Sequence, residues 1–176
     1  MLVPLPFILD PIIKNTILDF VFFSDTSYWK ENISGNTYNR KYCTVNKYNI
    51  PLTPILKDYS KFIFSLLDLT KQVEETTFGN FIGVQKEGGF VQPHTDSKDA
   101  NGWEHIRINF LVSKPIRGGM PIINNEQYTI EENCSWYNHA SKWVHSSSPV
   151  VGDIPRIVLS LGAFVSPTEL HEAKIH

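Results

Sequence analysis

A histidine and an aspartate stand two residues apart in the segment Gln92-Pro93-His94-Thr95-Asp96. On a β-strand, residues i and i+2 point to the same side, so these two side chains can converge on one point. Imidazole nitrogens and carboxylate oxygens are both common ligands of divalent metal ions. The pair therefore predicts two ligands of a metal ion, and a third must come from elsewhere in the chain.

Two histidines could supply that third ligand, and either could instead be a structural histidine. His145 lies 51 residues after His94, and His139 is the alternative. An apolar run containing Arg156 follows, with the arginine eleven positions after His145. This spacing favours His145 as the third ligand.

Two histidines and one carboxylate on one face of a metal leave other positions open, as in non-heme Fe(II) oxygenases. A 2-oxo acid can then chelate the metal, and O2 can occupy the remaining position. Arg156 meets a further requirement, because a charge inside an apolar strand must face solvent or have an anionic partner. Pointing into a barrel, Arg156 could bind the distal carboxylate of 2-oxoglutarate through two parallel hydrogen bonds.

The elements that must position these side chains are mainly strands. Short β-type runs separated by turn residues begin after about Thr77, a pattern typical of sandwiches and barrels. The predicted strands are FGNFIGVQ, HIRINFLVS, MPIINNEQYTI, NCSWYNH, KWVHSS and PRIVLSLGAFV. We therefore expect a mainly β fold with flanking helices, a double-stranded β-helix of the jelly-roll, cupin-like class.

Two amphipathic helices are expected before these strands. One begins at Asp10-Pro11, where the aspartate can cap free N–H groups and proline gives up a donor that has no partner. The other begins in the same way at Thr53-Pro54. The polar and aromatic segment 24–50 between them could be loop and edge strand, or the rim of a substrate pocket.

The motifs PHTD, HIRINFLV and WVHSSSPVVGDIPRIVLSLGAFV, all within residues 90–165, resemble the Fe(II)/2-oxoglutarate-dependent oxygenase superfamily. The resemblance is closest to its aspartyl/asparaginyl β-hydroxylase-like and proline hydroxylase branch. Carried over position by position, it implies His94, Asp96 and His145 as the ligands of Fe(II).

The resemblance also implies residues that bind 2-oxoglutarate. Arg156 matches the arginine that anchors this co-substrate, and Arg107 and Asn109 match an R-x-(H/N) strand that would contact its other end. The sequence departs from the pattern at two points. Asn109 stands where histidine is common, and the step from His145 to Arg156 is one residue longer than in the pattern.

Composition limits the possible partners and the cellular location. The 176 residues suit one domain, with helical support over about 1–77 and a jelly-roll core over about 78–166. A net charge of -2 gives no basic excess for a nucleic-acid backbone, so nucleic acid is not an expected partner. Prolines and charges interrupt the apolar N-terminus, and Cys43 and Cys134 form no paired motif. We expect a cytoplasmic protein with no membrane partner and with free thiols.

The predicted activity is hydroxylation of an unactivated C–H bond by an Fe(II)- and 2-oxoglutarate-dependent dioxygenase that consumes O2. The resemblance suggests an amino acid, free or in a peptide, as the substrate. A non-catalytic, cupin-like metal-binding or sensor module is the main alternative, and it has no need of Arg156. Another cupin enzyme would usually present three histidines in place of His-x-Asp and His.

Overall fold

The computed structural model describes residues 2–31, 37–45, 50–173 and 175. Its helices are α1 (Pro11–Phe23), the 3-10 turn η1 (Thr26–Tyr28), α2 (Thr53–Leu66) and α3 (Pro167–Glu172). Its first strands are β1 (Val3–Ile8), β2 (Lys30–Glu31), β3 (Thr37–Thr44), β4 (Val73–Glu74), β5 (Phe81–His94) and β6 (Glu104–Ser113). The later strands are β7 (Arg117–Gly118), β8 (Pro121–Ile123), β9 (Glu126–Gln127), β10 (Cys134–Asn138), β11 (His145–Ser147), β12 (Val150–Val151) and β13 (Arg156–Val165).

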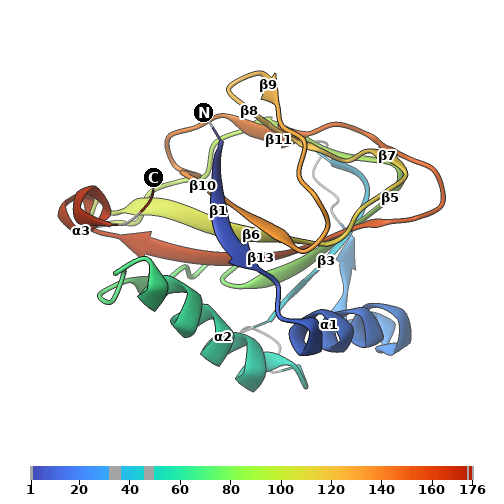
Figure 1. The fold of residues 1–176 in the computed structure, drawn as a ribbon, viewed down its shortest axis with the longest axis horizontal. Coiled ribbons are helices and arrows are strands. Elements are labelled where there is room, and N and C mark those ends of the chain that lie inside the picture. The colour runs from blue at the N-terminus through green and yellow to red at the C-terminus, as the bar shows by residue number, and fades with distance from the viewer. Residues whose placement is uncertain (1, 32–36, 46–49, 174, 176) are drawn as a thin grey trace.

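The strands form a curled antiparallel sheet in the order β1-β10-β6-β13-β5-β11-β8-β9, with β3 also paired to β5. A short second sheet contains β12 and β7. In Figure 1, α1 and α2 lie under the part of the sheet formed by β6 and β13, while β8, β9 and β11 close over its other side. The mainly β fold with flanking helices, predicted from the strand pattern, is confirmed.

Alternate side chains of the central strand β6 face an apolar core and a cavity that contains polar groups. On β6, Ile106, Ile108 and Phe110 pack in the main apolar core, together with residues of α1 and α2. The intervening residues Arg107 and Asn109 line a cavity on the opposite face. Since side chains alternate along a strand, β6 faces the helices with one set of residues and the cavity with the other.

The helices begin largely as expected. The Asp10 carboxylate accepts hydrogen bonds from the backbone N–H groups of Ile12 and Ile13, at 2.7 and 3.3 Å, and so caps α1. The prediction that the second helix begins in the same way as the first was wrong in one detail. Leu52 is the N-cap of α2 and makes no side-chain capping bond, because the Thr53 hydroxyl donates to the carbonyl of Val45.

The first 77 residues supply strands as well as helices. β1 pairs with β10, and β3 pairs with β5 beside the cavity. Segment 24–50 therefore contains the edge strand β2 and, between β2 and β5, the strand β3, whose residues Arg40 and Tyr42 line the cavity. Residues 32–36 and 46–49 lie outside the described part. The predicted helical support thus also contributes part of the sheet and of the cavity wall.

A bulge in β5 interrupts the pairing of this strand with β3. Gln85 pairs with Arg40, and Phe90 pairs with Tyr38, so four residues of β5 stand opposite Asn39. The side-chain amide of Asn39 donates to the Glu87 carbonyl at 2.7 Å and fixes this irregularity. Beyond the bulge, β5 pairs with β11, with His94 directly opposite His145.

Candidate metal centre

His94, Asp96 and His145 meet at one point. Each offers a ligand atom, and these atoms all lie within 4.8 Å of one another. His94 is the last residue of β5, Asp96 follows two residues later, and His145 opens β11. The Asp96 N–H donates to the Ala140 carbonyl at 2.8 Å, which holds the chain after β5 close to the segment before β11. Strand pairing thus brings together residues far apart in the sequence.

Both imidazoles are held with one nitrogen turned toward the shared centre. His94 Nδ1 lies 2.8 Å from the Gln92 carbonyl, and His145 Nδ1 lies 3.0 Å from the Trp143 carbonyl. A carbonyl accepts only, so in each ring Nδ1 carries a proton and Nε2 is the nitrogen available to a metal. Burial and the nearby His94 also lower the pKa of His145, so this ring is neutral at pH 7. The two Nε2 atoms lie 3.5 and 3.9 Å from the Asp96 carboxylate.

Asp96 is surrounded by positive and polar groups. Burial acts to raise its pKa, but Arg107 and the neighbouring imidazoles outweigh burial and hold the pKa below its usual value. Its Oδ2 lies 3.5 Å from Arg107 Nε and 3.5 Å from His105 Nδ1. The carboxylate is therefore ionised, as a metal ligand must be.

Arg107 is itself fixed by a buried carboxylate. Its Nη2 donates to Glu75 at 2.9 Å and its Nη1 donates to the Gly79 carbonyl at 3.1 Å. Glu75 also accepts from the backbone N–H groups of residues 77–79. A Cβ at Gly162 would lie 2.7 Å from Arg107 Nη1, so the glycine on β13 makes room for the guanidinium. Arg107 lines the cavity, with its donors directed to these protein groups.

His139 is occupied elsewhere. Its Nε2 lies 3.1 Å from Glu104, which also accepts a bond of 2.8 Å from the Ser141 hydroxyl and pairs with Lys98. These contacts tie the turn before β11 to the start of β6. Among the described residues, the group that could hold a metal ion has His145 as its third member. His139 contacts Glu104 instead.

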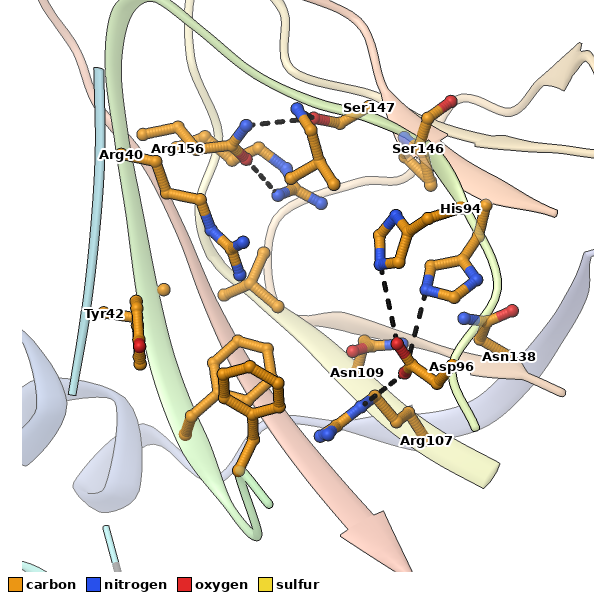
Figure 2. Close-up of a pocket in the computed structure, with 18 of the residues that line it drawn as sticks. Arg40, Tyr42, His94, Asp96, Arg107, Asn109, Asn138, Ser146, Ser147 and Arg156 are labelled. Atoms are coloured by element: carbon orange, nitrogen blue, oxygen red, sulfur yellow. Dashed lines mark hydrogen bonds and ion pairs between the residues drawn. The ribbon is translucent and has the colours of Figure 1, made fainter. Parts of the chain in front are cut away.

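A cavity of about 260 Å³ adjoins the three ligands. Arg156 lines it from β13, is 9% exposed, and donates from Nη1 to the Gln85 side chain. Gln85 in turn donates to the Ser147 hydroxyl at 2.9 Å. The Arg156 Nε is buried without a hydrogen-bond partner in the described part of the chain. Figure 2 shows Arg156 on the side of the cavity away from Asp96.

Other cavity residues were not identified from the sequence. Arg40, Tyr42 and Gln85 line it beside Arg156, and Asn138 lines it beside Asn109 and the metal ligands. The only available signal was a period of two, which places Arg40 and Tyr42 on one face of a strand. Buried Asn138 Oδ1 has no hydrogen-bond partner among the described residues, but no sequence motif marks this asparagine.

The donor set fits a divalent transition metal such as Fe(II). It offers two imidazoles and one ionised carboxylate, and backbone carbonyls fix the ring orientations as is usual for metal-binding histidines. Two ligand atoms about 2.1 Å from one ion stand about 3–4 Å apart. The distances from His94 Nε2 to Asp96 Oδ1, 3.5 Å, and from His145 Nε2 to Asp96 Oδ2, 3.9 Å, fall within that range.

Several solved structures resemble this chain in fold. SnoN, a non-heme alpha-ketoglutarate-dependent epimerase from nogalamycin biosynthesis, matches with a TM-score of 0.68 at 14% identity, over 94% of this chain and 78% of its own. A prolyl hydroxylase from Trichoplax adhaerens, in complex with a hypoxia inducible factor peptide, matches with a TM-score of 0.68 at 10% identity, over 97% and 86%. The chain has the double-stranded β-helix fold.

A prolyl-4-hydroxylase from Pseudomonas putida also matches, with a TM-score of 0.56 at 11% identity, over 77% of this chain and 76% of its own. Searches of protein-family models and of curated proteins found no match. At such low identity the likeness establishes the fold alone. No described helix is long and apolar enough to cross a membrane.

Proposed function

We propose that this protein is an Fe(II)- and 2-oxoglutarate-dependent dioxygenase that hydroxylates an unactivated C–H bond. One observation carries the proposal. The cluster of His94, Asp96 and His145 opens into the same cavity as the buried guanidinium of Arg156, which has no carboxylate partner among the described residues. A site for metal and a site for an anion thus share one small space. The neighbouring structures support the proposal, because they include a non-heme alpha-ketoglutarate-dependent enzyme and prolyl hydroxylases of the same fold.

In this proposal, His94, Asp96 and His145 hold the iron. Bound together with 2-oxoglutarate and O2, the iron would supply the oxidising power that cleaves the C–H bond. The protein contributes position and charge. Arg107 and His105 keep the Asp96 carboxylate oriented and ionised, while Gln92 and Trp143 carbonyls keep the imidazole lone pairs directed at the metal.

Arg156 would bind the distal carboxylate of 2-oxoglutarate. Its position is fixed by Gln85, which Ser147 holds in turn, so the guanidinium is oriented before the ligand arrives. Trp136 and Val158 form an apolar wall around this part of the cavity and would exclude water. In such surroundings a charge-assisted, bidentate pair is stronger than it is in water.

Arg107 and Asn109 remain predicted contacts of the other end of the co-substrate. Both line the cavity beside Asp96 (Figure 2). Because the Arg107 donors also engage Glu75, Gly79 and Asp96, this arginine would orient Asp96 in addition to any contact with the co-substrate. Asn109 offers a side-chain amide near the metal ligands.

The proposed substrate is an amino acid, free or within a peptide. Prolyl hydroxylases among the neighbours favour this class, and the cavity of about 260 Å³ would admit a co-substrate and the reacting part of a second small molecule. Assignment to the aspartyl/asparaginyl β-hydroxylase-like and proline hydroxylase branch rests on the motifs of residues 90–165. The absence of nucleic-acid and membrane partners and a cytoplasmic location also remain predictions.

Anaerobic binding of Fe(II) and 2-oxoglutarate tests the proposal. We expect a weak visible charge-transfer band with both ligands, and succinate formation once O2 is admitted. Replacement of Arg156 by Gln should leave metal affinity intact and weaken 2-oxoglutarate binding by on the order of 10–100-fold, because a charge-assisted pair is lost. Arg117→Gln, an exposed arginine on β7, is the matched control and should behave like the wild type.

Two results would contradict the proposal. A protein that binds Fe(II) but gives neither the band nor succinate would be a metal-binding module without this catalysis. Unchanged 2-oxoglutarate affinity in Arg156→Gln would mean that this arginine has a purely structural role.

A further inference from the structure

A second guanidinium faces the cavity, from a strand that lies outside the metal-binding motifs. Arg40 belongs to β3 and pairs across the sheet with Gln85. In Figure 2 its side chain extends from β3 into the cavity, on the same side as Arg156 and away from His94 and Asp96. None of the roles assigned above to the metal ligands, Arg107 or Arg156 uses Arg40.

Among the described residues, the Arg40 guanidinium has aromatic neighbours and no ion-pair partner. Its guanidinium carbon lies 5.6 Å from the centre of the Phe81 ring and 6.0 Å from that of Tyr42. Gly83 faces the same place, where a Cβ would lie 3.7 Å from Arg40 Nη2, so the cavity stays open beside the guanidinium. Aromatic faces orient an arginine while leaving its N–H groups free to bind an anion in plane.

No carboxylate of the described residues forms an ion pair with Arg40 or Arg156. Residues 32–36 and 46–49, outside the described part, include no aspartate or glutamate. Glu75 is engaged by Arg107, and Asp96 is a metal ligand in the proposed function. The cavity therefore has two cations for which the described protein provides no paired anion.

The two guanidiniums also act on each other. Burial, and then the charge of Arg107, lower the pKa of Arg40 to about 10. Burial, and then the charge of Arg40, lower the pKa of Arg156 to about 9. Both remain cationic at pH 7, so they repel each other unless an anion binds between them. One bound 2-oxoglutarate would place a distal carboxylate at Arg156 and leave Arg40 unmatched.

We propose that Arg40 binds a carboxylate of the primary substrate, and that this substrate is a small molecule with a free carboxylate, such as an unblocked amino acid. This inference rests on the proposed function, which places 2-oxoglutarate at Arg156. It narrows the substrate class, because an internal residue of a peptide has no free main-chain carboxylate. Binding at Arg40 would hold the substrate across the cavity from the metal ligands.

The test uses full-length protein loaded with Zn(II), a diamagnetic substitute for iron, and saturated with 2-oxoglutarate. Acetate is the probe, since it is a minimal carboxylate, and acetamide is its neutral counterpart. Arginine Nε–Hε resonances report binding, and the Arg40→Gln spectrum assigns the Arg40 signal. We expect acetate, and not acetamide, to shift that signal saturably while 2-oxoglutarate stays bound.

Variants separate the possible roles of Arg40. Arg40→Gln should weaken acetate binding at least about 10-fold, as expected for loss of a charge-assisted hydrogen bond, and leave 2-oxoglutarate affinity unchanged. Arg40→Lys, which keeps the charge, should recover part of the acetate affinity and guards against a folding defect. Arg117→Gln is the surface control and should change neither affinity.

Three outcomes would overturn the inference. Equal acetate binding by wild type and Arg40→Gln would show that Arg40 is not the anion site, as would an acetate affinity no greater than that for acetamide. Displacement of 2-oxoglutarate by acetate, with loss of 2-oxoglutarate affinity in Arg40→Gln, would assign Arg40 to the co-substrate. If wild-type protein binds Zn(II) but no 2-oxoglutarate, the proposed function itself fails, and acetate binding to the Zn(II) form then reports on Arg40 separately.

Discussion

Residues of the same type have different roles near the proposed metal centre. His145 and His139 lie six positions apart, and both are at least partly buried. Their neighbours distinguish them. His145 has its Nδ1 next to a carbonyl and its Nε2 directed at Asp96, whereas the Nε2 of His139 is engaged by Glu104. The contact made by the second nitrogen decides which histidine can bind a metal.

Replacing each histidine by alanine tests this distinction. His145→Ala should weaken Fe(II) or Co(II) binding by more than the roughly 10–100-fold that loss of an outer partner costs, because a direct ligand disappears. His139→Ala should lower stability and keep most of the metal affinity. Anaerobic titration calorimetry measures both. The reverse ranking would transfer the third ligand to His139.

At the scale of the element, the bulge in β5 positions the centre. β5 pairs with β3 on both sides of the bulge, while its other partner changes from β13 before the bulge to β11 after it. Gly89 lies within the bulge, where an added Cβ would come within 2.7 Å of the backbone oxygens of Asn39 and Lys86. Backbone atoms cannot give way as a side chain could, so the glycine is required by close approach.

Gly89→Ala should therefore disturb both stability and the site. We expect a loss of about 1–3 kcal/mol in the free energy of unfolding, as for other overpacked positions, together with weaker metal binding, since His94 follows the bulge. Gly102→Ala is the control, at an open turn with φ +77°. It should cost about 1–2 kcal/mol through left-handed strain and leave metal affinity unchanged. Equal metal affinity in the two variants would show that the bulge does not position the metal ligands.

At the scale of the whole molecule, ionised carboxylates link distant parts of the fold. Glu75 connects the chain after β4 to β6, and Glu104 connects β6 to the turn before β11. For Glu104, burial acts to raise the pKa, but bonds from Lys98, Ser141 and His139 lower it to about 2. The pKa of Glu75 is also lowered, because Arg107 and backbone N–H groups outweigh burial.

These shifts predict a loss of stability in acid. The unfolded chain takes up protons near pH 4.5 and the folded chain only at lower pH, so the stabilisation is present above 4.5 and is lost as pH falls toward 2. Glu104→Gln should lower the free energy of unfolding by about 1–2 kcal/mol at pH 7. This figure allows for solvent screening at the half-exposed Lys98. The difference from wild type should shrink by about pH 2.5. Denaturant unfolding of the metal-free protein measures it. The exposed Glu87→Gln serves as control, and a difference that is constant with pH would contradict the assignment.

The sequence by itself determined the strand-rich fold class and the residue pattern of its central strands. β6 and β13 follow the predicted runs closely, because alternating or continuously apolar segments leave few other ways to bury their side chains. Asp10-Pro11 fixed the start of α1, since its capping bonds are local. His94 and Asp96 were predicted for the same reason: two residues apart, they share a face.

Only the tertiary structure decided which distant groups meet. His145 stands opposite His94 because β11 pairs with β5, and no local pattern encodes that register. Arg40 and Glu75 lie in the part of the chain from which little of the site was expected, and their roles follow from strand pairing and from a buried ion pair. Helix caps and same-face residue pairs can be predicted from the sequence because they depend on spacing along the chain. The charge balance of the cavity depends on long-range packing.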